Sequence, residues 1–69
     1  MAFSLEFEDK NRNMFLIGIY ETHAGAWTGM CKDLDGKAIK PYYYRTWKND
    51  NVETVDFGSH SEFYYITEI

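Results

Sequence analysis

Apolar and polar residues alternate along most of the chain, with the period of two that is typical of β-strands. In residues 2–8, the apolar side chains Phe3, Leu5 and Phe7 fall on one face and polar side chains on the other. We therefore expect a half-buried strand here, followed by a turn in the polar cluster DKNRN at 9–13.

Residues 14–22 are apolar on both faces of the expected strand. One face carries Phe15, Ile17 and Ile19, and the other carries Leu16, Gly18 and Tyr20. Strands that are apolar on both sides are typical of the middle of a sheet whose two faces are covered. The pattern therefore predicts a central strand.

Four further strands are expected after this one. Their ranges are 26–32, 37–47, 52–57 and 62–69. The Asp-Gly pair at 35–36, between two extended runs, is a strong signal for a β-hairpin turn. All the breaks between the runs are short, which favours antiparallel neighbours over crossover connections.

The pattern as a whole predicts an all-β fold, a small antiparallel meander of about six strands that forms a barrel or a sandwich. The strand order stays open, because a Greek key has the same sequence of elements. The alternative is an α+β fold with a C-terminal helix at 60–69, because Ser59 and Glu62 have the spacing of a capping box. The residues at 63–67, FYYIT, prefer strands, so the all-β fold is the main prediction.

Composition indicates a single domain, 1–69, with an aromatic core. A chain of 69 residues is too short to build two cores. Five Phe, six Tyr and two Trp outnumber the ten Leu, Ile and Val residues. Because each ring buries a large area, the rings are expected to supply much of the core.

Cysteine, histidine and glycine usage argues against several kinds of chemistry. Cys31 is the single cysteine, so no disulfide forms within the chain, and His23 and His60 are too few to complete a usual zinc site. No glycine-rich phosphate loop is present. Nothing in the sequence places either histidine beside Cys31 as a base. We therefore expect a non-catalytic protein without a cofactor or metal.

The expected location is the cytoplasm. The first residues, MAFSLEFEDK, lack the basic and apolar regions of a secretion signal. No apolar run approaches the length of a membrane span. A lone cysteine is also typical of a protein that stays in a reducing compartment.

Charge is distributed unevenly, although the net charge is −4. Residues 32–48 carry five Lys and Arg residues against two Asp, whereas residues 49–69 carry five acidic residues and no Lys or Arg. The basic zone includes KPYYYRTWK at 40–48, with four aromatic rings and three cations in nine positions. This stretch is the candidate binding segment.

Alternation within that segment predicts a binding face. Tyr43, Arg45 and Trp47 would share one side of a strand. Tyr, Trp and Arg are enriched at the energetic centres of protein interfaces. Acidic residues of the next strand are expected to lie close to the cations and to neutralise them. The expected partner-binding residues are Tyr43, Arg45, Trp47, Lys48, Glu53, Asp56 and Glu62.

The main functional prediction is a small acidic protein that docks on a larger protein. We expect an inhibitor of a host defence or nucleic-acid enzyme, encoded by a phage or mobile element, either of the anti-CRISPR kind or a nucleic-acid mimic that uses its carboxylates. The alternative is a single-stranded nucleic-acid-binding module that uses the basic aromatic hairpin 37–48, although the acidic net charge weighs against it. Pairing of two copies through an exposed edge strand formed by the β-rich final segment, 62–69, is a further alternative.

Overall fold

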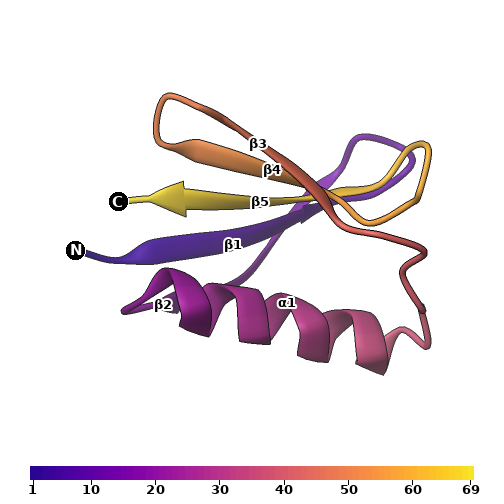
Figure 1. Cartoon of the computed structure of the whole chain (residues 1–69), viewed down its shortest axis with the longest axis horizontal. Helices are drawn as coiled ribbons and strands as arrows, with labels where there is room; N and C mark the ends of the chain where they lie inside the picture. The colour runs from indigo at the N-terminus through magenta and orange to yellow at the C-terminus, as the bar shows by residue number, and fades with distance from the viewer.

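Five antiparallel strands form one open sheet, and a single helix packs across one of its faces (Figure 1). The computed structural model describes residues 1–69. The elements are β1 (Phe3–Glu8), β2 (Met14–Tyr20), α1 (His23–Gly36), β3 (Arg45–Asn49), β4 (Val52–Asp56) and β5 (Phe63–Glu68). The spatial order of the strands is β2-β1-β5-β4-β3. The molecule is therefore mostly β, but it is not a closed barrel.

The strand order also differs from a meander, because β5 lies between β1 and β4. Leu5 on β1 faces Ile66 on β5, and Tyr64 faces Val55 on β4. The two chain ends meet beside this pairing, since Ala2 and Ile69 exchange two backbone hydrogen bonds (Figure 1). The last strand thus joins the two hairpins into one sheet, so the alternative in which the final segment 62–69 is an exposed edge strand was wrong.

The core lies between the helix and the sheet. Nine apolar residues are buried there: Leu5, Phe7, Ala26, Met30, Leu34, Val55, Phe57, Tyr64 and Ile66. Aromatic residues contribute three of the nine, and the rings of Phe7 and Phe57 both contact that of Tyr64. The prediction that rings supply much of this small core is confirmed.

Helix α1 occupies residues for which a strand (26–32) and a hairpin turn (33–36) were predicted, and both predictions were wrong. Ala26, Met30 and Leu34, each four residues apart, form one buried stripe that covers the apolar face of the sheet. The side chain of Thr22 caps the helix by accepting a hydrogen bond from Gly25 N–H at 2.9 Å. The four-residue spacing of these apolar residues indicates a helix. The residues between them favoured the predicted strand, so the local sequence carried both signals.

The predicted strand 37–47 is mostly a loop. The backbone N–H of Lys37 closes the end of α1, and regular pairing begins only at Arg45. The intervening residues carry the chain from the helix layer to the far edge of the sheet (Figure 1). Ala38 turns the chain with a left-handed backbone (φ 58°), and Pro41 lacks the N–H that a central strand would need.

Strand β2 is an edge strand, so its predicted central position was wrong. Its pairing with β1 shifts by one residue, and Ile17 is the extra residue of the resulting bulge. The shift places Leu16 opposite Glu6 and Phe15 opposite Phe7. Both faces of β2 therefore carry apolar side chains, yet Leu16 remains 62% exposed.

The alternative C-terminal helix at 60–69 was also wrong in position. Ser59 Oγ does accept a hydrogen bond from Glu62 N–H at 3.1 Å, which is half of the expected capping contact. The chain then enters strand β5, because Tyr64 and Ile66 fill the core beside β1. The hydrogen bond between Ser59 and Glu62 is thus present without a helix after it. The single helix of the fold lies at 23–36.

Candidate binding surface

The face of the sheet opposite α1 has no element packed on it, and we call it the open face (Figure 1). Cross-strand pairing and alternation define which side chains it presents. From one edge to the other they are Met14, Leu16 and Ile19; Ser4, Glu6 and Glu8; Phe63, Tyr65 and Thr67; Val52, Thr54 and Asp56; and Arg45, Trp47 and Asn49.

Part of the open face forms a groove of about 480 Å³, which we call the aromatic groove. Trp47 pairs with Thr54, and Thr54 pairs with Tyr65, so a small side chain separates two large rings. Their backbones are about 10 Å apart, two strand spacings, which leaves room for a flat group between the rings. The lining residues are Glu8, Lys10, Arg12, Trp47, Thr54, His60, Ser61, Phe63 and Tyr65.

Two cationic side chains from the turn after β1 form part of the rim of the aromatic groove. Lys10 and Arg12 lie in the turn between β1 and β2. Asp9 fixes this turn, because its carboxylate accepts hydrogen bonds from the backbone N–H groups of Asn11 and Asn13, both at 2.9 Å. Those bonds lower the pKa of Asp9, with the Asn13 N–H as the largest cause. The rim cations are thus carried on an ordered turn.

A hydrogen bond orients one wall of the groove. Tyr65 Oη donates to Glu8 Oε1 at 2.7 Å. Burial raises the pKa of Tyr65 to about 12, and the bond to Glu8 adds to the shift. The phenol is therefore neutral at physiological pH, where it acts as a hydrogen-bond donor and as a flat wall.

Arg45 is held beside the groove by partners on two sides. Its guanidinium donates to the buried Asp56 carboxylate at 3.0 Å and lies 5.9 Å from the ring centre of Tyr43. The N–H of Gly58 lowers the pKa of Asp56 most, and Arg45 adds to the shift. Arg45 and Trp47 share the open face as predicted, and the neutralisation of Arg45 by Asp56 is also as expected.

Other residues of the predicted set lie elsewhere. Lys48 and Glu53 face each other on the helix side of the sheet, where Glu53 also bonds His23 Nε2 at 2.5 Å. Glu62 lines a separate groove of about 180 Å³, together with Tyr42 and Lys40. The structure therefore brings Tyr43, Arg45, Trp47 and Asp56 together, but not the other three.

Sequence reasoning missed most of the aromatic groove. Lys10, Arg12 and His60 come from two loops, and Phe63 and Tyr65 come from β5. Alternation within 63–67 could have separated Phe63 and Tyr65 from the buried Tyr64 and Ile66. No sequence pattern predicts that Lys10, Arg12 and His60 line the groove, because their loops come together only through the pairing of β1 with β5.

The other tyrosines of the segment 42–44 serve different roles. Tyr44 packs on α1, with its ring centre 5.1 Å from that of Trp27. Burial raises the pKa of Tyr44, and its hydroxyl lies 3.8 Å from Cys31 Sγ. Tyr42 is 90% exposed. Only Tyr43 of the three lies against Arg45, as predicted.

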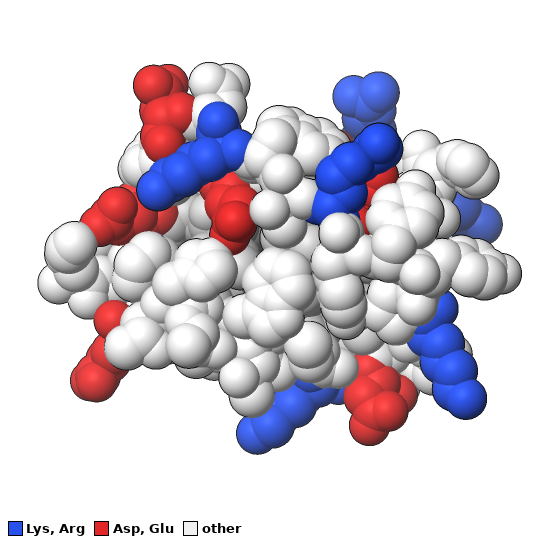
Figure 2. All heavy atoms as spheres, in the orientation of Figure 1, with Lys and Arg blue, Asp and Glu red and all other residues white.

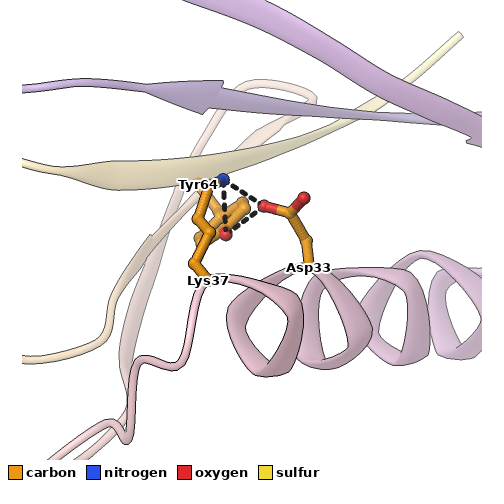
Figure 3. Close-up of polar contacts among 3 residues, drawn as sticks. All are labelled: Asp33, Lys37 and Tyr64. Atoms are coloured by element: carbon orange, nitrogen blue, oxygen red, sulfur yellow. Dashed lines mark hydrogen bonds and ion pairs between the residues drawn. The ribbon is translucent and has the colours of Figure 1, made fainter.

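A polar cluster at the end of the helix stabilises the fold (Figure 3). The buried Tyr64 donates its hydroxyl proton to Asp33 at 2.5 Å, and Lys37 pairs with the same carboxylate. The Lys37 ammonium also lies 3.7 Å from the ring centre of Phe7. Burial, and then the bond to Asp33, raise the pKa of Tyr64 far above its usual value. The three groups tie α1 to β5, and none of them lines a groove.

The surface carries no large field of one sign on the side seen in Figure 2. Lysine and arginine side chains alternate with aspartate and glutamate around the rim of this view, and uncharged atoms cover its middle. A mixed surface of this kind supports specific contacts with a shaped partner better than attraction to a polyanion.

Cys31 lies two helical turns from His23, roughly 12 Å along the axis, so the two do not form a nucleophile and base. No three His, Cys, Asp or Glu side chains lie close enough together to hold a metal ion. The one helix, of 14 residues, is neither long nor apolar enough to cross a membrane.

By its fold and surface, the protein is a small antiparallel sheet that one helix covers on one face and that exposes aromatic side chains on the other. Comparison with protein-family models, with curated proteins and with solved structures found nothing that matches this chain. The open face and its aromatic groove are therefore the observations that bear on function.

Proposed function

We propose that this chain is a non-catalytic binding protein that docks on a larger protein through its open face. The observation that carries the proposal is the aromatic groove, with Trp47 and Tyr65 on either side of Thr54 and no element of the chain over them. Large apolar groups left on one uncovered face are typical of protein interaction sites.

The composition of the surface supports a protein partner. Trp47 is 47% exposed, and Arg45 stands next to it on the same strand with its guanidinium already oriented by Asp56 and Tyr43. Trp, Tyr and Arg dominate the energetic centres of protein interfaces. Because Asp56 and Tyr43 already orient the Arg45 guanidinium, less conformational entropy of this side chain is lost when the partner docks.

The size of the face sets how the partner would sit. Five strands of about six residues give a flat area on the order of 400 Å², from the strand spacing and rise per residue. A standard interface takes about 800 Å² from each partner. We therefore propose that Tyr43, which lies against Arg45, joins the contact, and that the groove receives one side chain of the partner.

An inhibitory role extends the proposal. A bound chain with a net charge of −4 is attracted to the basic channel of a nucleic-acid or defence enzyme and would obstruct it. The placement of the carboxylates gives no support to strict mimicry of a phosphate backbone. Asp56 is buried against Arg45, Glu53 bonds His23, and Glu62 lines another groove. The rings, rather than a row of carboxylates, are the proposed contact.

The second candidate function is binding of single-stranded nucleic acid in the aromatic groove. Rings on an open antiparallel sheet with cations at the rim are the arrangement that favours it. Lys10 and Arg12 are the cations at this groove, since Arg45 is paired with Asp56. Two cations in a chain of net charge −4 give little phosphate neutralisation, so the protein partner is preferred.

The test is capture of partners from bacterial lysate by the tagged chain, with and without nuclease. Trp47→Ala and Arg45→Ala should lose a stoichiometric protein that the wild type retains after nuclease treatment. Tyr42→Ala is the matched control, because this ring is exposed but lies outside the aromatic groove. Circular dichroism checks that each variant is folded.

Two results would contradict the proposal. A protein retained equally by Trp47→Ala and Arg45→Ala would place the docking surface elsewhere. Recovery of nuclease-sensitive nucleic acid alone, lost in Trp47→Ala, would replace the protein partner by the second candidate function.

A further inference from the structure

The two edges of the sheet differ in how they are protected. β3, at one edge, has the sequence RTWKN and carries two cations. β2, at the other edge, has the sequence MFLIGIY, with no charged residue and no proline. Natural edge strands are usually shielded by charges, proline or covering elements, because their free backbone groups attract another strand. β2 has no charge and no proline within its seven residues, and the bulge at Ile17 is the one feature of this kind that it carries.

The side chains of β2 are exposed as well. Met14, Phe15, Leu16 and Ile19 are all about half exposed or more. A long, apolar edge strand with no neighbouring strand on one side is the feature expected of a strand that pairs with another chain.

The bulge gives β2 a distinctive facing pattern. Leu16 and Ile19 point to the open face, because they pair with Glu6 and Ser4. Phe15 and Tyr20 point to the helix side, opposite Phe7 and Phe3. Ile17 and Gly18, at the centre, both belong to the helix side, since Ile17 packs against the core and Gly18 pairs with Leu5.

This pattern is self-complementary in an antiparallel pair. With the twofold axis between Ile17 and Gly18, Phe15 meets Tyr20 of a second copy and Leu16 meets Ile19, and every pair shares a face. A shift of one residue either way would set Leu16 opposite Gly18 or Tyr20, which lie on the other face. The pattern therefore favours one register.

We infer that a second copy of this chain pairs with β2 in that register, so that two sheets join into one of ten strands. Leu16 and Ile19 of both copies then close into one apolar cluster on the joined open faces. No charge within β2 opposes the approach, although each chain has a net charge of −4. This inference concerns the β2 edge of the open face, whereas the proposed docking site centres on the aromatic groove around Trp47 and Tyr65, and it does not depend on that proposal.

The first experiment measures mass in solution by sedimentation over about 5–500 μM protein. The wild type should reach twice the monomer mass, whereas Leu16→Lys should stay monomeric, because its charge would lie in the apolar cluster. Trp47→Lys, at the opposite edge, is the matched control and should remain dimeric. Both positions are half exposed or more, so both variants should fold.

The second experiment tests the register with cysteine pairs in a Cys31→Ser background. Directly opposite residues have Cβ atoms about 5 Å apart, close enough to be bridged by a disulfide after a small adjustment. A mixture of Leu16→Cys and Ile19→Cys chains should form a disulfide-linked heterodimer. Either variant alone should link far less, because residue 16 of one copy lies three positions from residue 16 of the other.

Four results would overturn the inference. The first is a wild type that is monomeric across the whole concentration range. The second is a Leu16→Lys variant that dimerises as well as the wild type. The third is a cross-link that forms equally in the single-variant samples. Capture of a foreign strand by a monomeric wild type would also overturn it, because the occupant of the edge would then be another protein.

Discussion

The two faces of the sheet are built from alternate residues of the same strands, yet they differ in what covers them. On the helix side, Leu5, Ile66 and Val55 are almost completely buried. On the open face, Leu16 and Trp47 keep about half of their surface exposed. The difference indicates that one face stabilises the fold while the other remains available for contacts.

The largest contrast is expected between two leucines. Leu5→Ala removes a side chain from the centre of the core and should lower the free energy of unfolding by about 3 kcal/mol, from lost burial and the cavity left behind. Leu16→Ala, on the open face, should change the free energy of unfolding by no more than about 0.5 kcal/mol at protein concentrations where the chain is monomeric. Urea unfolding of both variants measures the difference. Equal losses would contradict the assignment of the two faces.

A second contrast compares two glycines of α1. A Cβ at Gly29 would lie 2.3 Å from the Tyr20 hydroxyl, whereas a Cβ at Gly36 would meet nothing within 4 Å. Gly29→Ala should therefore destabilise the protein by about 1–3 kcal/mol, through displacement of the Tyr20 ring. Gly36→Ala should be neutral or stabilising by up to about 1 kcal/mol, because alanine favours helix. A stable Gly29→Ala variant would show that Tyr20 does not pack beneath the helix.

The third contrast concerns two tyrosine hydroxyls. Tyr64→Phe removes the donor to Asp33 in the buried cluster of Figure 3 and should cost about 1–2 kcal/mol. Tyr65→Phe removes the donor to Glu8 on the open face and should cost less, because water can replace it there. Thermal or urea unfolding measures both. A larger loss for Tyr65→Phe would reverse the predicted contrast.

The last contrast concerns how stability depends on pH. Tyr65 has a pKa of about 12 in the folded chain and about 10 when unfolded, so the folded state keeps a proton that the unfolded state releases. Stability should be unaffected by this group below pH 10 and should fall between about pH 10 and 12. Asp56, with a lowered pKa, works in the opposite sense: its contribution is present above about pH 4 and is lost in more acidic solution.

Unfolding free energies measured across pH test both signs. Tyr65→Phe should reduce the alkaline decline without removing it, because the pKa values of Tyr64 and Tyr44 are also raised. Asp56→Asn should likewise reduce the acidic decline, to which Asp9 also contributes, even though it lowers stability at neutral pH. A decline unchanged in these variants would show that other groups are responsible.

Three strands could be predicted closely from alternation, because β1, β4 and β5 each bury one face. The helix could not be found in this way, since Trp27, Thr28 and the two glycines of its first half resemble a strand with breaks. The spacing of Ala26, Met30 and Leu34 was the available signal. Strand order depended on the pairing of β5 with β1, which joins residues about sixty positions apart and leaves no local trace.

The candidate surface could be predicted only where it lies within one strand. Arg45 and Trp47 share a face because they are two residues apart, so alternation was sufficient. The aromatic groove also needs Tyr65 from β5 and Arg12 from a distant turn. Such assembly follows from tertiary packing, and no spacing along the chain reveals it.

The central claim, that the open face contacts the partner, is tested most directly by the two tryptophans. Trp47 lies in the aromatic groove and Trp27 lies on α1, next to Tyr44. Fluorotryptophan labelling gives one ¹⁹F signal for each, and Trp47→Phe assigns them. On addition of the captured partner, the Trp47 signal should shift or broaden, while the Trp27 signal should stay close to its position in the free protein. A shift confined to Trp27 would contradict the account and place the contact on the helix.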